Sequence, residues 1–304
     1  MSPTDAPTPV SDIPPLPPRP PEMHKGQAGR VAILAGSRGM VGAAVLSAIG
    51  ALRGGAGLVR VYCPQSIQLT VAGCEPCMMT VPLGEDHEGH VACDPLELAR
   101  NLGWADVLAV GPGMGQAGHL PDLLAHVLRV FNGPAVVDAD GLNNLAGLGV
   151  AVWQARRGRT TVLTPHPGEM GRLRAGAGLS GDVVIGESAR LRIAHEYAAL
   201  AGVVLVLKGY HTVVCDCERA YVNQTGNAGM ATGGMGDVLT GLLAALLGQG
   251  MQAFDAARLA VYTHGLAADR CARSIAPIGF LARDVAEELP AALADASRQR
   301  IGFR

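Results

Sequence analysis

The chain has 304 residues, of which 49% are hydrophobic and 41 are glycine, and its formal net charge is −2. A chain of this length and apolar content can bury a large core, in one large α/β domain or two small ones. The balanced charge, without a basic stripe or an interleaving of basic and aromatic residues, excludes nucleic acid as the expected partner.

Residues 1–22 differ in composition from the rest, with nine prolines among the first 21 positions. This composition predicts a disordered or polyproline tail that folding does not require, ahead of a single folded domain over residues 23–304. The sequence has no signal-peptide pattern and no apolar run long enough to span a bilayer. Seven cysteines without framework spacing fit reduced thiols, so we expect a cytoplasmic protein with no membrane partner.

From Lys25 onward, short continuous apolar runs alternate with stretches of helical spacing. Continuous apolar runs are typical of strands that are buried on both faces of a parallel sheet. The pattern therefore predicts an α/β fold with a doubly wound, mostly parallel sheet flanked by helices on both faces. The predicted strands are 31–35, 58–63, 106–110, 135–137, 161–163 and 203–207, and the predicted helices are 42–52, 120–130, 141–145, 169–174 and 187–201.

Glycine-rich and polar motifs follow five of these strands. In open α/β sheets, ligands bind beyond the carboxyl ends of the strands, so the motifs are expected to share one ligand-binding edge. They occupy residues 36–43, 111–116, 138–143, 164–169 and 208–212.

The segment 225–247 joins a glycine-rich loop directly to an apolar helix. Its glycines allow positive φ and close approach to a ligand, and the N-terminus of a helix attracts anions. We predict an anion hole at Gly233, Gly234 and Gly236. Asp237 stands at the start of the helix, where it suits a general base that takes a proton from a hydroxyl attacking a phosphoryl group. The alternative is an aspartate that only caps the helix.

Three further motifs have competing interpretations. The glycines of 111–115 lack the G-x-G-x-x-G spacing, which argues against a Rossmann dehydrogenase. His166 lies between two prolines at a predicted strand end, where a ligand contact is favoured over a core histidine. Lys208 ends a strand and is either a solvated terminus or a phosphate contact.

Metal-binding patterns are weak. The cysteine pairs Cys74 with Cys77 and Cys215 with Cys217 lack the accompanying histidines of a zinc site, so zinc is disfavoured. The segment 84–90 carries carboxylates and histidines, but an exposed loop or hairpin explains it better than a metal site. The sequence therefore leaves any protein ligands to a metal unknown.

The motifs together resemble the ADP-dependent NAD(P)H-hydrate dehydratases, a carbohydrate-kinase-like branch of the ribokinase-like fold. The resemblance extends over residues 21–289 and is carried by residues 25–31, 51–59, 111–115, 138–143, 164–169, 206–209 and 227–237. It implies a lyase that returns the S form of hydrated NADH or NADPH to NADH or NADPH. The reaction would consume ADP, or alternatively ATP, with Mg²⁺ as a cofactor, and ADP would yield AMP and phosphate.

The resemblance also implies roles for single residues. It makes Asp237 both the catalytic residue and a contact of the hydrate. The other hydrate contacts that it implies are Ala43, Gly115 and His166. The nucleotide contacts that it implies are Lys208, Gly209, Tyr210, His211, Thr212 and Gly236.

Two other functions use the same residues. A kinase of this fold, acting on a thiazole, a pyrimidine or a sugar alcohol, would release a phosphorylated product. A nucleotide sensor would bind its ligands without turnover. For the dehydratase we expect only small-molecule substrates, a homo-oligomer, most simply a tetramer, and no epimerase domain, since only the proline-rich tail precedes it.

Overall fold

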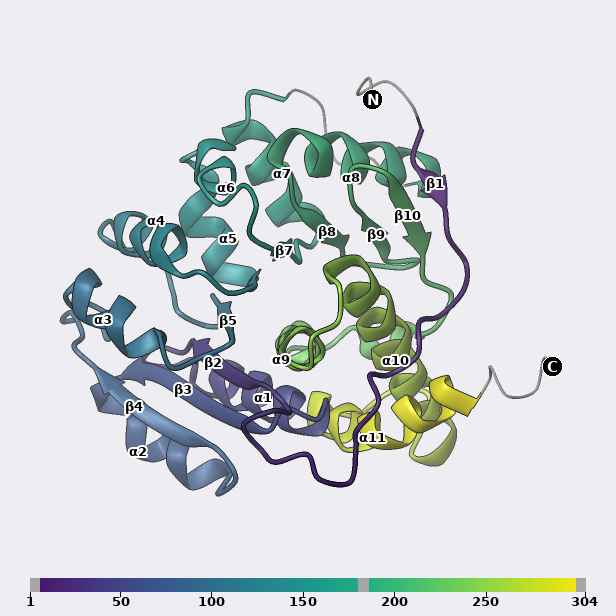
Figure 1. Cartoon of the computed structure of the whole chain (residues 1–304), viewed down its shortest axis with the longest axis horizontal. Helices are drawn as coiled ribbons and strands as arrows, with labels where there is room; N and C mark the ends of the chain where they lie inside the picture. The colour runs from purple at the N-terminus through teal and green to yellow at the C-terminus, as the bar shows by residue number, and fades with distance from the viewer. Residues whose placement is uncertain (1–5, 180–185, 299–304) are drawn as a thin grey trace.

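The computed structural model describes residues 6–179 and 186–298, which form one ten-stranded sheet with helices on both faces (Figure 1). In order across the sheet, the strands are β1 (Thr8–Pro9), β10 (Arg219–Val222), β9 (Val213–Cys215), β8 (Val204–Leu207), β7 (Thr161–Leu163), β6 (Ala135–Val137), β5 (Val107–Val110), β2 (Arg30–Leu34), β3 (Leu58–Pro64) and β4 (Met79–Leu83). All neighbours from β8 to β4 pair in parallel, whereas β9 is antiparallel to β8 and β10. The predicted fold class is confirmed.

The helices form two layers, and the sheet curves around one of them (Figure 1). The inner layer contains α1 (Val41–Arg53), α2 (Gln65–Cys74), α9 (Met235–Gly248), α10 (Ala253–Ser274) and α11 (Ala282–Arg298). The outer layer contains α3 (Pro95–Leu102), α4 (Leu120–Val130), α5 (Ala139–Ala146), α6 (Ala151–Gln154), α7 (Pro167–Gly176) and α8 (Glu187–Ala201). Among the described residues, no helix is long and apolar enough to cross a membrane.

Strand β2 shows why the strands read as continuous apolar runs. Val31 and Ile33 pack into the core beneath the inner helices, while Ala32 and Leu34 pack into the core beneath the outer helices. All four side chains are buried, because helices cover both faces of the sheet.

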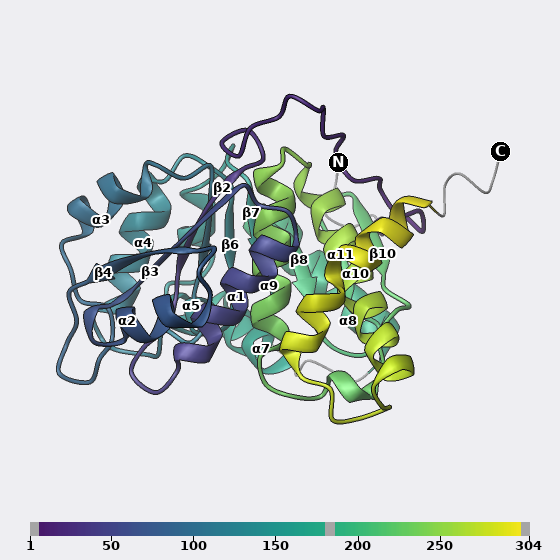
Figure 2. The same cartoon turned by 90° about the horizontal axis from the view of Figure 1, so that it is seen from below.

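Helices α1 and α9 cross at glycines, which brings their backbones into contact. A Cβ on Gly241 would lie 1.9 Å from the Ser47 carbonyl oxygen, and one on Gly50 would lie 2.3 Å from the Val238 carbonyl oxygen. Figure 2 shows α1, α9 and α11 running alongside one another on the same side of the sheet. This close crossing holds the N-terminus of α9 in place against the edge where the strands end.

The predicted strands and helices all appear, with ends shifted by two residues or fewer. The sequence did not predict strands β1, β4, β9 and β10 or helices α2, α3, α6, α10 and α11. In strand β4 only Leu83 is buried, and the strand contains Pro82, which weakens an apolar-run signal. The long helix α10 buries polar side chains, among them Arg258 and His264, so its apolar stripe is interrupted.

The disordered tail predicted for residues 1–22 is wrong for the described part, residues 6–22. Strand β1 pairs in parallel with β10, and Ile13 and Leu16 pack against the inner core. The buried Arg258 side chain donates to the Asp12 carbonyl oxygen at 2.6 Å. Proline does not prevent this packing, because β1 is an edge strand and the segment runs extended over the surface of α10.

Deletion of residues 1–21 should therefore lower the free energy of unfolding by about 2–4 kcal/mol, since it exposes apolar surface and removes one of the two partners of a buried guanidinium, the other being Asp255. Thermal or urea unfolding measures the effect. Turnover at low temperature should stay near that of the full chain, because the deleted segment contains none of the predicted site residues. Unchanged stability would contradict the packing of this segment.

Candidate active site

The glycine loop ends at Gly234, which begins α9 with a left-handed backbone of φ 91°. The first helical hydrogen bond runs from Val238 N to the Gly234 oxygen at 3.2 Å. The N–H groups of Met235, Gly236 and Asp237 precede that bond and lack helical partners. Together with the helix dipole, they give this end of α9 the character of an anion site.

The preceding part of the loop is tied to α10. Asp269 accepts hydrogen bonds from Gly226 N and from the Asn227 side chain, each at 2.9 Å. Gly265 brings α10 so close that a Cβ there would lie 2.3 Å from Thr225 Oγ1. The glycine loop is therefore held by a carboxylate and by direct backbone contact, which limits its freedom before a ligand binds.

A buried ion pair lies beside the start of α9. Lys208 Nζ is 2.5 Å from Asp138 Oδ1 and 3.8 Å from Glu169 Oε2. The second oxygen of Asp138 accepts from Thr240 Oγ1 of α9 at 2.8 Å. Because Asp138 follows β6 and Lys208 follows β8, this network joins the strand ends to the helix that carries Asp237.

Asp237 is partly buried beside this network. Burial raises the pKa of its carboxyl group, Asp138 and Asp140 raise it further, and Lys208 offsets part of the rise, so that the pKa is about 7. A carboxylate with this pKa is matched to proton transfer near neutral pH, which a helix cap does not need.

His166 caps α7 and forms a pair with Glu169. Its Nδ1 accepts from Gly168 N at 3.0 Å, so Nε2 carries the proton and lies 3.1 Å from Glu169 Oε1. Desolvation and the positive charges of Lys208 and Arg172 lower the pKa of His166. The ring is half exposed at the strand end, and its contact with a ligand stays a prediction.

Gly115 and Ala43 lie at neighbouring points of the same edge. Gly115 N donates to Asp140 Oδ2 at 2.9 Å, and the charge of Asp140 in turn raises the pKa of Asp237. A Cβ on Gly113 would lie 2.7 Å from the Ala43 Cβ, so the loop after β5 packs directly on the first turn of α1.

The loop after Lys208 is held by Arg190 of α8. Its guanidinium donates to the Leu207 and Lys208 carbonyl oxygens at 2.8 and 3.0 Å, and also to the Tyr210 oxygen. The rings of Tyr210 and His211 stack at 3.9 Å between centroids, and Tyr210 is 84% exposed. The ring of Tyr210 therefore presents a flat, exposed surface in the loop that follows Lys208.

Sequence reasoning assigned no roles to Asp138, Glu169 or Thr240. Asp138 and Glu169 lie within strand-end motifs, so the sequence indicated that they lie at the ligand-binding edge. Thr240 lies within an apolar helix, and nothing in the sequence indicated its role. Arg190 and Asp269 carried no local signal, because they act on loops that are distant in the sequence.

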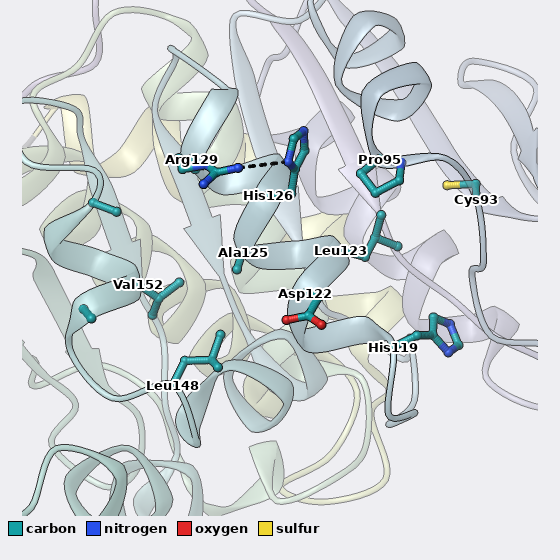
Figure 3. Close-up of a pocket in the computed structure, with 12 residues that line it drawn as sticks. Cys93, Pro95, His119, Asp122, Leu123, Ala125, His126, Arg129, Leu148 and Val152 are labelled. Carbon is teal, nitrogen blue, oxygen red and sulfur yellow. Dashed lines mark hydrogen bonds between the residues drawn. The ribbon is translucent and has the colours of Figure 1, made fainter.

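A separate cavity of about 760 Å³ opens beside α4 (Figure 3). His126 and Arg129 of α4 line it and contact each other at 3.2 Å, and Leu148 and Val152 contribute from the opposite side. None of the residues that line it belongs to the strand-end motifs. The cavity is therefore distinct from the candidate active site.

The structure defines a protein of the ribokinase-like fold, in which a glycine loop and a helix N-terminus place an acidic residue at the ends of the strands. Residues 31–291 match the family described as NAD(P)H-hydrate dehydratase. The chain belongs to this family, whose members are lyases.

Curated relatives are bifunctional NAD(P)H-hydrate repair enzymes. The one from Moorella thermoacetica is 43% identical over 269 residues, which cover 88% of this chain and 49% of the relative. The one from Escherichia coli is 40% identical over 263 residues, which cover 86% of this chain and 47% of that relative. The chain therefore spans about half the length of these relatives.

Solved structures agree with the fold. An ADP/ATP-dependent NAD(P)H-hydrate dehydratase from Bacillus subtilis, co-crystallized with ATP/Mg²⁺, has a TM-score of 0.78 and 29% identity, and the match covers 93% of this chain and 95% of that one. Ribokinase from Thermotoga maritima has a TM-score of 0.53 and 17% identity, and the match covers 88% of this chain and 99% of ribokinase. This likeness shows a shared fold alone.

Proposed function

We propose that the chain catalyses ADP-dependent dehydration of the S form of hydrated NADH or NADPH, with ATP as an alternative donor. The observation that carries the proposal is Asp237, a carboxyl group with a pKa near 7 beside the free N–H groups of α9. Family membership supports the substrate, and the curated relatives are named as repair enzymes of the same hydrates.

In the proposed reaction, Asp237 accepts the proton of the ring hydroxyl while that oxygen attacks the terminal phosphorus of ADP. The bond to the leaving AMP breaks, and the N–H groups of Gly233, Gly234 and Gly236 stabilise the charge on the transferred group. The ring nitrogen then expels phosphate, the carbon–oxygen bond breaks, and loss of a ring proton restores the dihydropyridine. The protein supplies position and charge stabilisation, and the ring supplies the driving electrons.

For the substrates, Ala43, Gly115 and His166 are proposed to contact the hydrate together with Asp237. Lys208, Gly209, Tyr210, His211, Thr212 and Gly236 are proposed to contact the adenine nucleotide. The exposed aromatic surface of Tyr210 supports this division, as does the distance of only 3.3 Å between Lys208 Nζ and a Cβ built on Gly236.

Mg²⁺ is proposed to accompany the nucleotide. Among the described residues, no three His, Cys, Asp or Glu side chains are arranged as a ready metal cage. The oxygens of the two buried carboxylates at the strand ends, Asp138 and Glu169, are engaged by Lys208, Thr240 and His166, so they do not fit as its ligands. Magnesium would therefore be held mainly by the substrate phosphates and water, and it would neutralise the phosphate charge.

Lys208→Ala should weaken nucleotide binding at least tenfold while changing hydrate binding less, because an ammonium group pairs best with phosphate. Calorimetric titration of each ligand separately measures the two effects. Lys25→Ala, in the exposed N-terminal loop, is the control and should change neither. Equal losses for both ligands would place Lys208 outside the nucleotide site.

A kinase of the same fold remains the second candidate. The two activities differ in their stable product: a kinase accumulates the phosphorylated acceptor, whereas the dehydratase releases free phosphate and a reduced nicotinamide. Product analysis after incubation with hydrated NADH and ADP separates them.

We also propose a cytoplasmic homo-oligomer, most simply a tetramer. The exposed apolar side chains Ile275, Ile278 and Leu281 between α10 and α11 support self-association. All seven cysteines are free thiols, which fits a reducing compartment. Light scattering during size-exclusion chromatography measures the number of subunits.

A further inference from the structure

The turn that follows β4 docks against the strand-end site. Glu85 and Val91 form an antiparallel bridge that closes it. Arg38, in the loop after β2, donates from its backbone N to the Gly89 oxygen at 3.2 Å and from its side chain to the His87 oxygen at 3.0 Å. The hairpin alternative predicted for residues 84–90 therefore describes this segment better than a freely exposed loop.

His90 lies on the inner side of this turn, with its side chain 14% exposed. Its Nδ1 is 3.2 Å from Asp86 Oδ2 and 3.6 Å from Glu88 Oε2. Asp86 Oδ1 also accepts from the backbone N of Glu88 and of His90, each at 2.9 Å. Desolvation opposes ionisation of Asp86, but these hydrogen bonds outweigh it and lower the pKa to about 2.

An ionised carboxylate accepts hydrogen bonds and donates none. In the neutral form of the ring, the proton is therefore held on Nδ1, which leaves a lone pair on Nε2. Within residues 6–179 and 186–298, no side chain or backbone group hydrogen-bonds His90 Nε2.

The unpaired nitrogen lies against Gly115, a proposed hydrate contact. A Cβ on Gly115 would lie 2.6 Å from His90 Nε2 and 2.4 Å from Cδ2. Gly115 also has φ 74°, and its N–H is bonded to Asp140. A continuous set of contacts thus connects His90 through Gly115 and Asp140 to the surroundings of Asp237.

We propose that His90, oriented by Asp86, is a specificity-determining contact that accepts a hydrogen bond from the hydrated dinucleotide. The proposal rests on the proposed function of this site. Since Nε2 presents a lone pair, its partner is an N–H or O–H donor, and a phosphate group is disfavoured. The hydrate offers such donors on the carboxamide and the hydroxyl of the damaged ring, on the ribose hydroxyls and on the adenine amino group.

Two variants test the contact in the full chain. His90→Phe keeps an aromatic ring but removes the acceptor, so KM for the hydrate should rise about tenfold, the worth of one hydrogen bond. Asp86→Asn presents an amide donor to Nδ1, which moves the imidazole proton to Nε2 and should raise the same KM to a similar extent. In both variants, kcat and KM for ADP should change less than twofold.

His87→Phe is the matched control, because it makes the same substitution in the same turn on a ring that is 90% exposed. It should leave all kinetic constants within twofold. Unchanged KM for the hydrate in His90→Phe would overturn the proposal. Equal losses for hydrate and ADP, with a lower Tm, would also overturn it by showing a purely structural role.

The hydrate of the reduced 3-acetylpyridine analogue separates the carboxamide from the other donors, since its methyl ketone has no N–H. If His90→Phe and the parent enzyme bind this analogue equally, the partner of Nε2 is the carboxamide. If the tenfold difference persists, the partner is one of the hydroxyls or the adenine amino group. Calorimetric Kd values keep the test independent of turnover, so a protein that binds hydrate through His90 but fails to dehydrate it would refute the proposed function alone.

Discussion

Asp237→Asn should reduce turnover by roughly 10²–10⁴-fold with both ligands still bound, because it removes a positioned base and keeps a side chain of nearly the same shape. Steady-state rates at saturating ADP and hydrate measure the loss. Gly234, and not Asp237, is the N-cap of α9, so the alternative that Asp237 only caps the helix is wrong. Turnover within a few-fold of the parent would show that Asp237 is not the catalytic base.

The same substitution should stabilise the folded protein at pH 8. The pKa of Asp237 rises from 3.8 in its ordinary setting to about 7 in the folded chain, so the unfolded state ionises first as pH rises. The folded state therefore loses stability as the pH rises from about 4 to 7, and above pH 7 this loss of stability is complete. Removing this charge should gain on the order of 1–3 kcal/mol at pH 8 and nothing at pH 3.5.

The pH dependence of kcat/KM follows from the same group. A base is active when deprotonated, so the rate should rise through a pKa near 7 and then level. The residual activity of Asp237→Asn should not show this rise with pH. A parent enzyme whose rate is flat between pH 5.5 and 8.5 would contradict the assignment.

Asp138→Ala should lower the free energy of unfolding by about 3–5 kcal/mol, because it removes the nearest counter-charge of the buried Lys208 ammonium and leaves only the weaker interactions with Glu169 and Asp237. Urea unfolding at neutral pH measures the loss. The matched comparison is the double variant Asp138→Ala with Lys208→Met, in which no charge is left unpaired. It should recover at least half of the lost stability.

Thr240→Val is a second comparison for the same network. It removes the hydrogen bond to Asp138 Oδ2 but leaves the ion pair intact, so it should cost about 1–2 kcal/mol. If the double variant Asp138→Ala with Lys208→Met is less stable than Asp138→Ala alone, the burial of Lys208 does not depend on Asp138.

The parts of the site that the sequence predicted are those whose chemistry is local. Asp237 follows its glycines directly, and the motifs containing Gly115 and His166 each follow a strand, so parallel topology alone brings them to one edge. The fold was predictable for the same reason, since helices on both faces require continuous apolar strands such as β2 and β5.

What the sequence did not predict depends on contacts between distant segments. Thr240 reads as part of an apolar helix, and its role comes from facing Asp138, which is 102 positions away. The proline-rich segment reads as disordered because its composition lacks apolar periodicity. Its packing depends on the buried Arg258, which is 246 positions away from Asp12.

The central claim is that this chain converts hydrated NADH to NADH at the expense of ADP, and one assay tests it directly. Purified protein is incubated with the S hydrate, ADP and Mg²⁺, while dihydronicotinamide absorbance is followed and AMP and phosphate are quantified. We expect absorbance to recover with one AMP and one phosphate formed for each NADH. A stable phosphorylated hydrate that accumulates without NADH would contradict the account and identify a kinase.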